Sequence, residues 1–169
     1  PRVGINRFRL PIIMNNKYGE TRSDDAEAAM YVSLNENKNG VSMSRLCTIL
    51  QSESLEKAVD VDFLKTILAR YREELRDETD KDLIEKAFIK LKFSYPVKQK
   101  SLKSDNWGWQ YYPVQFEAHE TKANGFELFI TLEYLYSSTC PCSLSMAKQY
   151  EREYADGKTK EGTGIGVPH

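Results

Sequence analysis

The sequence predicts an α+β domain in which helices pack on one face of an antiparallel sheet, and three patterns support this class. Residues 60–76 repeat apolar side chains every three or four positions, which is typical of an amphipathic helix. The stretches 26–34, 86–95 and 126–135 alternate apolar and polar side chains, which is typical of strands. An Asn-Gly dipeptide at 124–125 precedes the last of these stretches and predicts a hairpin turn. Helices between a first strand and later antiparallel strands indicate an α+β domain.

The first part of the chain is expected to differ from the rest. Residues 1–25 carry Pro11 and a pair of asparagines at 15–16 that suggests a turn, so we expect an irregular, basic arm. The strand at 26–34 then places alternate side chains on one face, namely Ala28, Met30, Val32 and Leu34.

Two helices are expected next. Ser44 can cap the first one, which carries Leu46, Ile49 and Leu50 on one face, and Cys47 within it is expected to be a packed thiol. Asp60 can cap the second helix at 60–76. Its apolar stripe consists of Val61, Leu64, Ile67, Leu68, Tyr71 and Leu75.

The later strands include three features of their own. Pro96 is expected to bend the strand that begins near Lys86, to end it, or to place it at an edge of the sheet. In the strand 109–120, His119 falls on the same face as its polar neighbours, which predicts a surface histidine. Four aromatic residues could stack on a base, but packing on an edge strand is the expected use: Trp107, Trp109, Tyr111 and Tyr112.

Composition excludes several classes of protein. The 169 residues carry a net charge of −1, so neither nucleic acid nor an anionic membrane surface is an expected partner. No apolar run approaches the roughly 18 residues of a membrane span, and no signal peptide is recognisable. The 3 cysteines argue against a disulfide framework and for a reducing, cytoplasmic compartment.

Potential metal ligands are concentrated in residues 137–169, which contain two of the 3 cysteines and one of the 2 histidines. The order is Thr-Cys-Pro-Cys-Ser at 139–143, a short helical pattern that Ser143 can cap, a glycine-rich run and a final His169. A thiol at the start of a helix meets the positive end of the helix dipole, which favours the thiolate. The glycines give the loop enough freedom to return His169 towards Cys140.

Other interpretations of this stretch stay open. The two cysteines can be small buried residues without a ligand. Since one residue separates Cys140 from Cys142, joint chelation of one metal is awkward, and one ligating thiol with a supporting neighbour is the better geometry. The Gly-Thr-Gly-Ile-Gly run at 162–166 lacks the Gly-Lys-Ser/Thr of a phosphate loop, so we interpret it as a hinge.

Four stretches together resemble the type IB branch of GTP cyclohydrolase I. They are Thr-Cys-Pro-Cys-Ser at 139–143, Val-Pro-His at 167–169, Gly-Ile-Asn-Arg-Phe-Arg-Leu-Pro at 4–11 and Gly-Val-Ser-Met-Ser-Arg-Leu at 40–46. The Cys-Pro-Cys-Ser element is the specific signal. The last stretch departs from the family's His-Met-Ser-Arg-Phe, because serine and leucine stand at positions 42 and 46.

This resemblance implies a function. It implies hydrolysis of GTP to 7,8-dihydroneopterin triphosphate and formate, the first step of tetrahydrofolate and pterin biosynthesis. Cys140 and His169 would ligate a divalent metal (zinc, manganese or iron) that lowers the pKa of bound water, and Cys142 would support the ligand. Ser44 and Arg45, a hydroxyl and a planar fork of donors at a helix N-terminus, suit the triphosphate. An ordinary cap with an exposed arginine is the alternative.

The resemblance also implies an organisation. It predicts a tunnelling fold, one module of a tandem pair, in a subunit of a homotetramer. We expect an arm at 1–25, the module at 26–154 and a glycine-rich active-site loop at 155–169. The chain begins at Pro1 and stops on an expected ligand, so we expect a fragment whose remaining metal ligand and pterin-anchoring glutamate lie beyond His169.

Two rival functions are kept beside this one. One is a non-catalytic metal-binding interaction module, for which the ligands present would be the complete set. The other is the tunnelling-fold nitrile reductase of queuosine synthesis, whose Glu-Ser/Leu-Lys-Ser/Ala motif is missing here.

Overall fold

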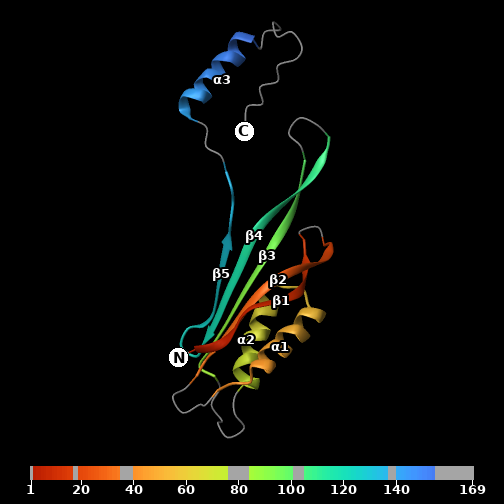
Figure 1. The fold of residues 1–169 in the computed structure, drawn as a ribbon, viewed down its shortest axis with the longest axis vertical. Coiled ribbons are helices and arrows are strands. Elements are labelled where there is room, and N and C mark those ends of the chain that lie inside the picture. Colours follow the sequence, from red (N-terminus) through yellow and green to blue (C-terminus); the bar gives the residue numbers. More distant parts are fainter. Residues whose placement is uncertain are drawn as a thin grey trace. The chain divides into compact units, whose positions relative to one another are not determined.

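The structure, a computed structural model, describes residues 2–16, 19–34, 40–75, 84–100, 105–136 and 140–154. The chain divides into two compact units, Pro1–Tyr134 and Leu135–His169. The first unit contains β1 (Arg2–Asn15), β2 (Thr21–Ser33), α1 (Met43–Glu56), α2 (Val61–Glu74), β3 (Lys86–Lys100), β4 (Trp107–Thr121) and β5 (Gly125–Leu132). The second contains α3 (Pro141–Tyr154). Figure 1 labels these elements.

The strands of the first unit form one five-stranded sheet in the order β1-β2-β3-β4-β5. Every neighbouring pair is antiparallel, and each strand pairs with the strand that precedes or follows it in the sequence (Figure 1). The predicted hairpin turn at residues 122–124 is confirmed, and Gly125 adopts a φ of 73° that glycine tolerates without strain. The sheet is therefore a meander whose only long connection, between β2 and β3, contains both helices of the unit.

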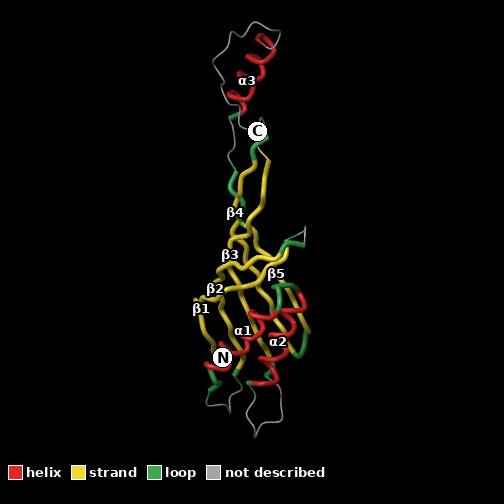
Figure 2. Tube along the Cα trace, turned by 90° about the vertical axis from the view of Figure 1, so that its right-hand side faces the viewer, coloured by secondary structure: helices red, strands yellow, loops and turns green. Residues whose placement is uncertain are grey.

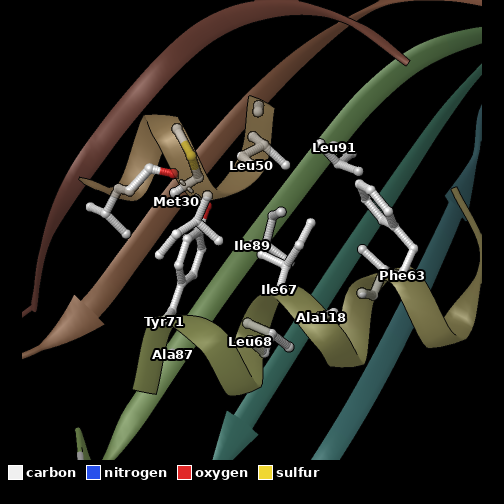
Figure 3. Close-up of a cluster of buried hydrophobic side chains, with 14 of the residues drawn as sticks. Met30, Leu50, Phe63, Ile67, Leu68, Tyr71, Ala87, Ile89, Leu91 and Ala118 are labelled. Atoms are coloured by element: carbon white, nitrogen blue, oxygen red, sulfur yellow. Dashed lines mark hydrogen bonds between the residues drawn. The ribbon is translucent and has the colours of Figure 1, made fainter. Parts of the chain in front are cut away.

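Helices α1 and α2 lie side by side on one face of this sheet, as Figure 2 shows. Most of the predicted stripe of α2 is buried, but Val61 is exposed, and Phe63, which the prediction left out, is buried. The predicted cap is confirmed because the Asp60 side chain accepts a hydrogen bond from the Phe63 amide over 2.7 Å. Figure 3 shows Ile67 and Tyr71 of α2 among side chains such as Ile89 of β3. Burial of each such apolar side chain contributes about 1.5–3 kcal/mol, so this layer supplies most of the driving force for folding.

The prediction of an irregular arm at 1–25 was wrong, because most of the arm forms β1. Leu10, Ile12 and Met14 alternate with exposed or half-buried neighbours and are buried in the core. The period of two was present in the sequence, but Pro11 argued against a strand. The proline is tolerated because β1 is an edge strand of the sheet.

Pro96 also lies where its strand has a partner on one side only. It lies inside β3 opposite Tyr111 of β4, and the pairing between β2 and β3 stops at Phe93. β3 is therefore an edge strand at Pro96, which was one of the three predicted outcomes.

The unit boundary differs from the predicted division of the chain. The predicted module at 26–154 contains the boundary between Tyr134 and Leu135, and β1 belongs to the first unit together with the rest of the sheet. The predicted glycine-rich loop at 155–169 lies outside the described residues and stays a prediction.

The predicted α+β class is confirmed, since two helices cover one face of an open antiparallel sheet as in the tunnelling fold. Within the described residues, no helix combines the length and apolar character that crossing a membrane requires.

Candidate functional site

Cys140 lies immediately before the first residue of α3. The Cys140 carbonyl oxygen accepts a hydrogen bond from the Leu144 amide over 3.0 Å, so Cys140 occupies the capping position of this helix. The prediction that Ser143 caps the helix was wrong. Pro141 is the first helical residue, a position that suits proline because its missing N–H would have had no partner in the helix.

The local environment stabilises the thiolate of Cys140. Backbone amides of Ser143 and Cys142 donate hydrogen bonds to the sulfur and are the main reason why its pKa lies below the ordinary value. A smaller contribution comes from the Cys142 side chain. The expected thiolate at a helix N-terminus is thus supported, although β5 ends at Leu132 and Cys140 does not directly follow a strand.

Both cysteines of the motif are free and exposed, which removes the interpretation of a buried pair. Cys47, in contrast, is half-buried against the core of the first unit, as predicted, and burial raises its pKa. Of the cysteines in the chain, Cys140 has the chemistry of a metal-binding thiolate.

The structure supports only part of the predicted metal site. Cys140 fits a zinc-like metal, because a stabilised, accessible thiolate is a preferred ligand of such ions. His169 lies outside the described residues, so its predicted approach to Cys140 stays a prediction. Within the described part of the chain, no group of three or more histidine, cysteine, aspartate or glutamate side chains is arranged to hold a metal ion.

The predicted triphosphate loop forms the start of α1. The capping residue is Ser42 rather than Ser44, and its side chain makes no hydrogen bond to the amides of the first turn. The Ser44 hydroxyl is exposed, 3.2 Å from the Ser42 hydroxyl. Arg45 is exposed as well, but its Nη1 donates a hydrogen bond to the Glu74 carbonyl oxygen over 2.7 Å. The first turn therefore offers a hydroxyl and a guanidinium near a helix N-terminus, a suitable site for an anion.

Ser44 and Arg45 belong to the first unit, whereas Cys140 and Cys142 belong to the second. The structure describes each pair within its own unit.

His119 is less exposed than predicted, since 23% of its side chain is accessible. Its ring centre lies 5.0 Å from that of Phe88 and 5.6 Å from that of Phe129. The His119 Nε2 atom is 3.1 Å from Glu117 Oε1. The other oxygen of Glu117, Oε2, forms an ion pair with Lys90 Nζ at 2.9 Å. Lys90, followed by His119, lowers the pKa of the Glu117 carboxyl group.

Sequence reasoning missed this polar cluster on the face of the sheet opposite the helices. Lys90 and Glu117 are directly opposite in the register of β3 and β4. The sequence indicated only that His119 lies on the same face of its strand as its polar neighbours, which include Glu117. The cross-strand partner could not be read without the register.

The chain matches the model of one protein family, described as type I GTP cyclohydrolase folE2, over residues 1–163. It is similar to curated proteins named GTP cyclohydrolase FolE2. The protein of Cereibacter sphaeroides (strain ATCC 17029) is 33% identical over 151 residues, 89% of this chain and 40% of the relative. That of Ruegeria pomeroyi is 34% identical over 146 residues, 86% of this chain and 37% of the relative. That of Hydrogenovibrio crunogenus is 32% identical over 152 residues, 89% of this chain and 47% of the relative. The chain thus spans less than half the length of these relatives.

Proposed function

Because the chain belongs to the type I GTP cyclohydrolase FolE2 family, we propose that its protein hydrolyses GTP to 7,8-dihydroneopterin triphosphate and formate. This reaction is the first step of tetrahydrofolate and pterin biosynthesis. The observation that carries the proposal is the state of Cys140, the first cysteine of the Cys-Pro-Cys-Ser motif. An exposed thiol whose pKa is lowered by helix amides is what a metal-dependent hydrolase needs at its metal.

Cys140 and His169 would hold a divalent metal, for which zinc, manganese and iron are the candidates. When bound, the metal supplies Lewis acidity that activates water at neutral pH. Cys140 would contribute a negatively charged ligand, whose ionised form the helix amides stabilise. The Cys142 side chain, which also interacts with the Cys140 sulfur, would hold that sulfur in place. Any further ligand would come from outside the described residues.

Ser44 and Arg45 would bind the triphosphate of GTP. The amides at the start of α1 donate no hydrogen bond to the capping side chain, and an anion can accept from them instead. Arg45 would give up its contact with the Glu74 carbonyl oxygen when its guanidinium turns to phosphate.

The protein would work as a homo-oligomer, a tetramer by analogy with the family, in the cytoplasm. The edge strand β5 supports an assembly, because it exposes large apolar side chains next to its unpaired backbone. These side chains are Phe129, Ile130 and Leu132.

The decisive experiment compares variants of the naturally encoded protein for bound metal per subunit and for formate released from GTP. Cys140→Ala and His169→Ala should lose both metal and activity. Cys142→Ala should keep the metal and lose activity by about 10–100-fold, as is usual for groups that support a ligand. Cys47→Ala, the matched control from the first unit, should keep both.

Two results would change the proposal. Loss of metal in Cys142→Ala with full metal in Cys140→Ala would reverse the roles of the two cysteines. Stoichiometric metal without any formate from the unmodified protein would instead indicate a metal-binding interaction module.

A further inference from the structure

A groove lies where β2 and β3 separate. The two strands pair from Ala26 and Phe93 to Val32 and Ala87, whereas β3 continues to Lys100 with β4 as its only partner. Two adjoining hollows of about 440 and 300 Å³ lie beside this unpaired edge of β3 and share lining residues from β3, β4 and the hairpin between β1 and β2. The shared residues are Asn16, Glu20, Tyr95, Pro96 and Trp109. We refer to the two hollows together as the tryptophan groove.

The wall from β4 is aromatic and exposed. Trp107 and Trp109 leave 59% and 56% of their surface accessible, although each indole is a large apolar group. Neither residue belongs to the core beneath α1 and α2, and their predicted packing on an edge strand stays a prediction. Exposed aromatic side chains beside a hollow are typical of ligand-binding sites.

The charged side chains of the groove differ in whether they already have a partner within the protein. Lys98 Nζ lies 5.6 Å from the centre of the Trp107 ring, and it takes part in none of the ion pairs found among the described residues. Arg22 lines the smaller hollow and is already paired with Asp24 at 2.7 Å. Glu20 is held by Asn16, whose Nδ2 donates to the Glu20 carboxylate over 2.7 Å. Lys98 is therefore the cation of the groove that, among the described residues, no carboxylate engages.

We propose that the tryptophan groove binds a small planar aromatic molecule that carries an anionic group. The ring stacks on Trp109, whose neighbour Trp107 already has a cation over its face. The anionic group meets Lys98, and the Glu20 carboxylate accepts a hydrogen bond from an amino group attached to the ring at the other end. The volumes of the two hollows suit a ligand of this size.

This inference goes beyond GTP hydrolysis and does not depend on it. The groove lies entirely in the first unit and contains none of the residues proposed to hold metal or triphosphate. If the protein did not hydrolyse GTP, the binding test at the groove would still be valid. If the groove bound no ligand, the proposed hydrolysis of GTP would be unaffected.

The sequence contains 2 tryptophans, both in the groove, so the fluorescence of these tryptophans reports on this site. The probe is adenosine 5′-monophosphate, which combines a planar ring with a phosphate. Adenosine lacks the charge, and ribose 5-phosphate lacks the ring. We expect saturable quenching by the monophosphate with half-saturation below about 1 mM, an affinity within reach of one stacked ring and one charge pair. Adenosine should bind at least about tenfold more weakly, because it lacks the charged hydrogen bond to Lys98.

Variants identify the groups involved. Lys98→Gln removes the charge but keeps a polar side chain, and it should weaken binding of the monophosphate about tenfold, with no change for adenosine. Lys86→Gln, at the opposite end of β3, is the control and should have no effect. Trp109→Leu should weaken the binding of both adenosine 5′-monophosphate and adenosine, and Trp107 remains as the fluorescent reporter. Equilibrium dialysis should give the same affinities as fluorescence.

Quenching that rises linearly without saturation would mean collision rather than binding and would overturn the proposal. Equal affinity of the unmodified protein and Lys98→Gln would overturn it as well. Fluorescence that changes with protein concentration alone would show that the groove instead receives a second copy of the chain, which sedimentation would verify.

Discussion

Arg45 in the first turn of α1 donates a hydrogen bond to the backbone carbonyl oxygen of Glu74, the last residue of α2, over 2.7 Å. The last carbonyl groups of a helix have no partner within it, and a cation there also interacts favourably with the helix dipole. Arg45 thus has a structural contact in addition to its proposed role with phosphate. The two roles can be separated, because one acts on folding and the other on substrate.

Arg45→Ala should lower the free energy of unfolding by about 0.5–1.5 kcal/mol through loss of this bond. It should also raise the Michaelis constant for GTP without changing the metal content. Urea unfolding and steady-state kinetics measure the two effects. Gln51→Ala, an exposed position of the same helix, should change neither. A Michaelis constant that stays the same while stability falls would leave Arg45 with its structural role only.

Glu53 connects α1 and α2 and gives stability a dependence on pH. Its carboxylate is paired with Lys57 at 2.8 Å and Arg70 at 2.9 Å, and the hydrogen bond from Lys57, followed by that from Arg70, lowers its pKa. In the unfolded chain the pKa of a glutamate is about 4.3. The stabilisation is therefore fully present above this value and is lost as the pH falls through the lower pKa of the folded state.

Glu53→Gln should lower the free energy of unfolding by about 1–3 kcal/mol at pH 7, mainly through Arg70. Lys57 is half exposed and should contribute little. The difference from the unmodified protein should shrink as the pH is lowered from 5 towards 3, as urea unfolding at each pH will measure. Glu73→Gln, an exposed carboxyl group of α2, should show no such trend. A difference that is constant with pH would contradict the assignment of this pair.

Gly4 allows β1 to approach β2 closely. A Cβ atom at this position would overlap the Met30 carbonyl oxygen and would lie 2.7 Å from the Tyr31 Cα atom. Both neighbours include backbone atoms that cannot turn away, so Gly4→Ala should destabilise the protein by at least about 1–3 kcal/mol. Gly108→Ala is the matched control, because no atom lies within 4 Å of its added Cβ. Thermal unfolding of both variants tests this, and equal melting temperatures would refute the close approach.

The cysteines should differ in their reactivity. With metal removed, iodoacetamide at pH 7.5 should modify Cys140 at least about tenfold faster than Cys47, because the thiolate is the reactive form. Amides at the start of α3 lower the pKa of Cys140, whereas burial raises that of Cys47. Peptide mass spectrometry over time measures both rates. Ser143→Ala should leave the rate of Cys140 almost unchanged, since the backbone amide persists, and similar rates for the two cysteines would contradict this account.

Two parts of the molecule follow from local sequence alone. The stripe of α2 is buried as predicted from Leu64 onwards, and Asp60 caps the helix, because both properties depend on residues within a few positions of each other. The thiolate character of Cys140 is equally local. The amides of Cys142 and Ser143 produce it, so predicting the helix was sufficient even though the predicted cap, Ser143, lies inside it.

Other features required the tertiary structure. β1 is a strand because β2 pairs with it and the helices cover its apolar side, which outweighs the effect of Pro11. Arg45 meets Glu74 across 29 positions of sequence, and the tryptophan groove exists because β2 and β3 separate. Periodicity and capping are read from the sequence because they depend on neighbours along the chain, whereas partners, exposure and hollows depend on which distant segments meet, and only the packing of the sheet against its helices determines that.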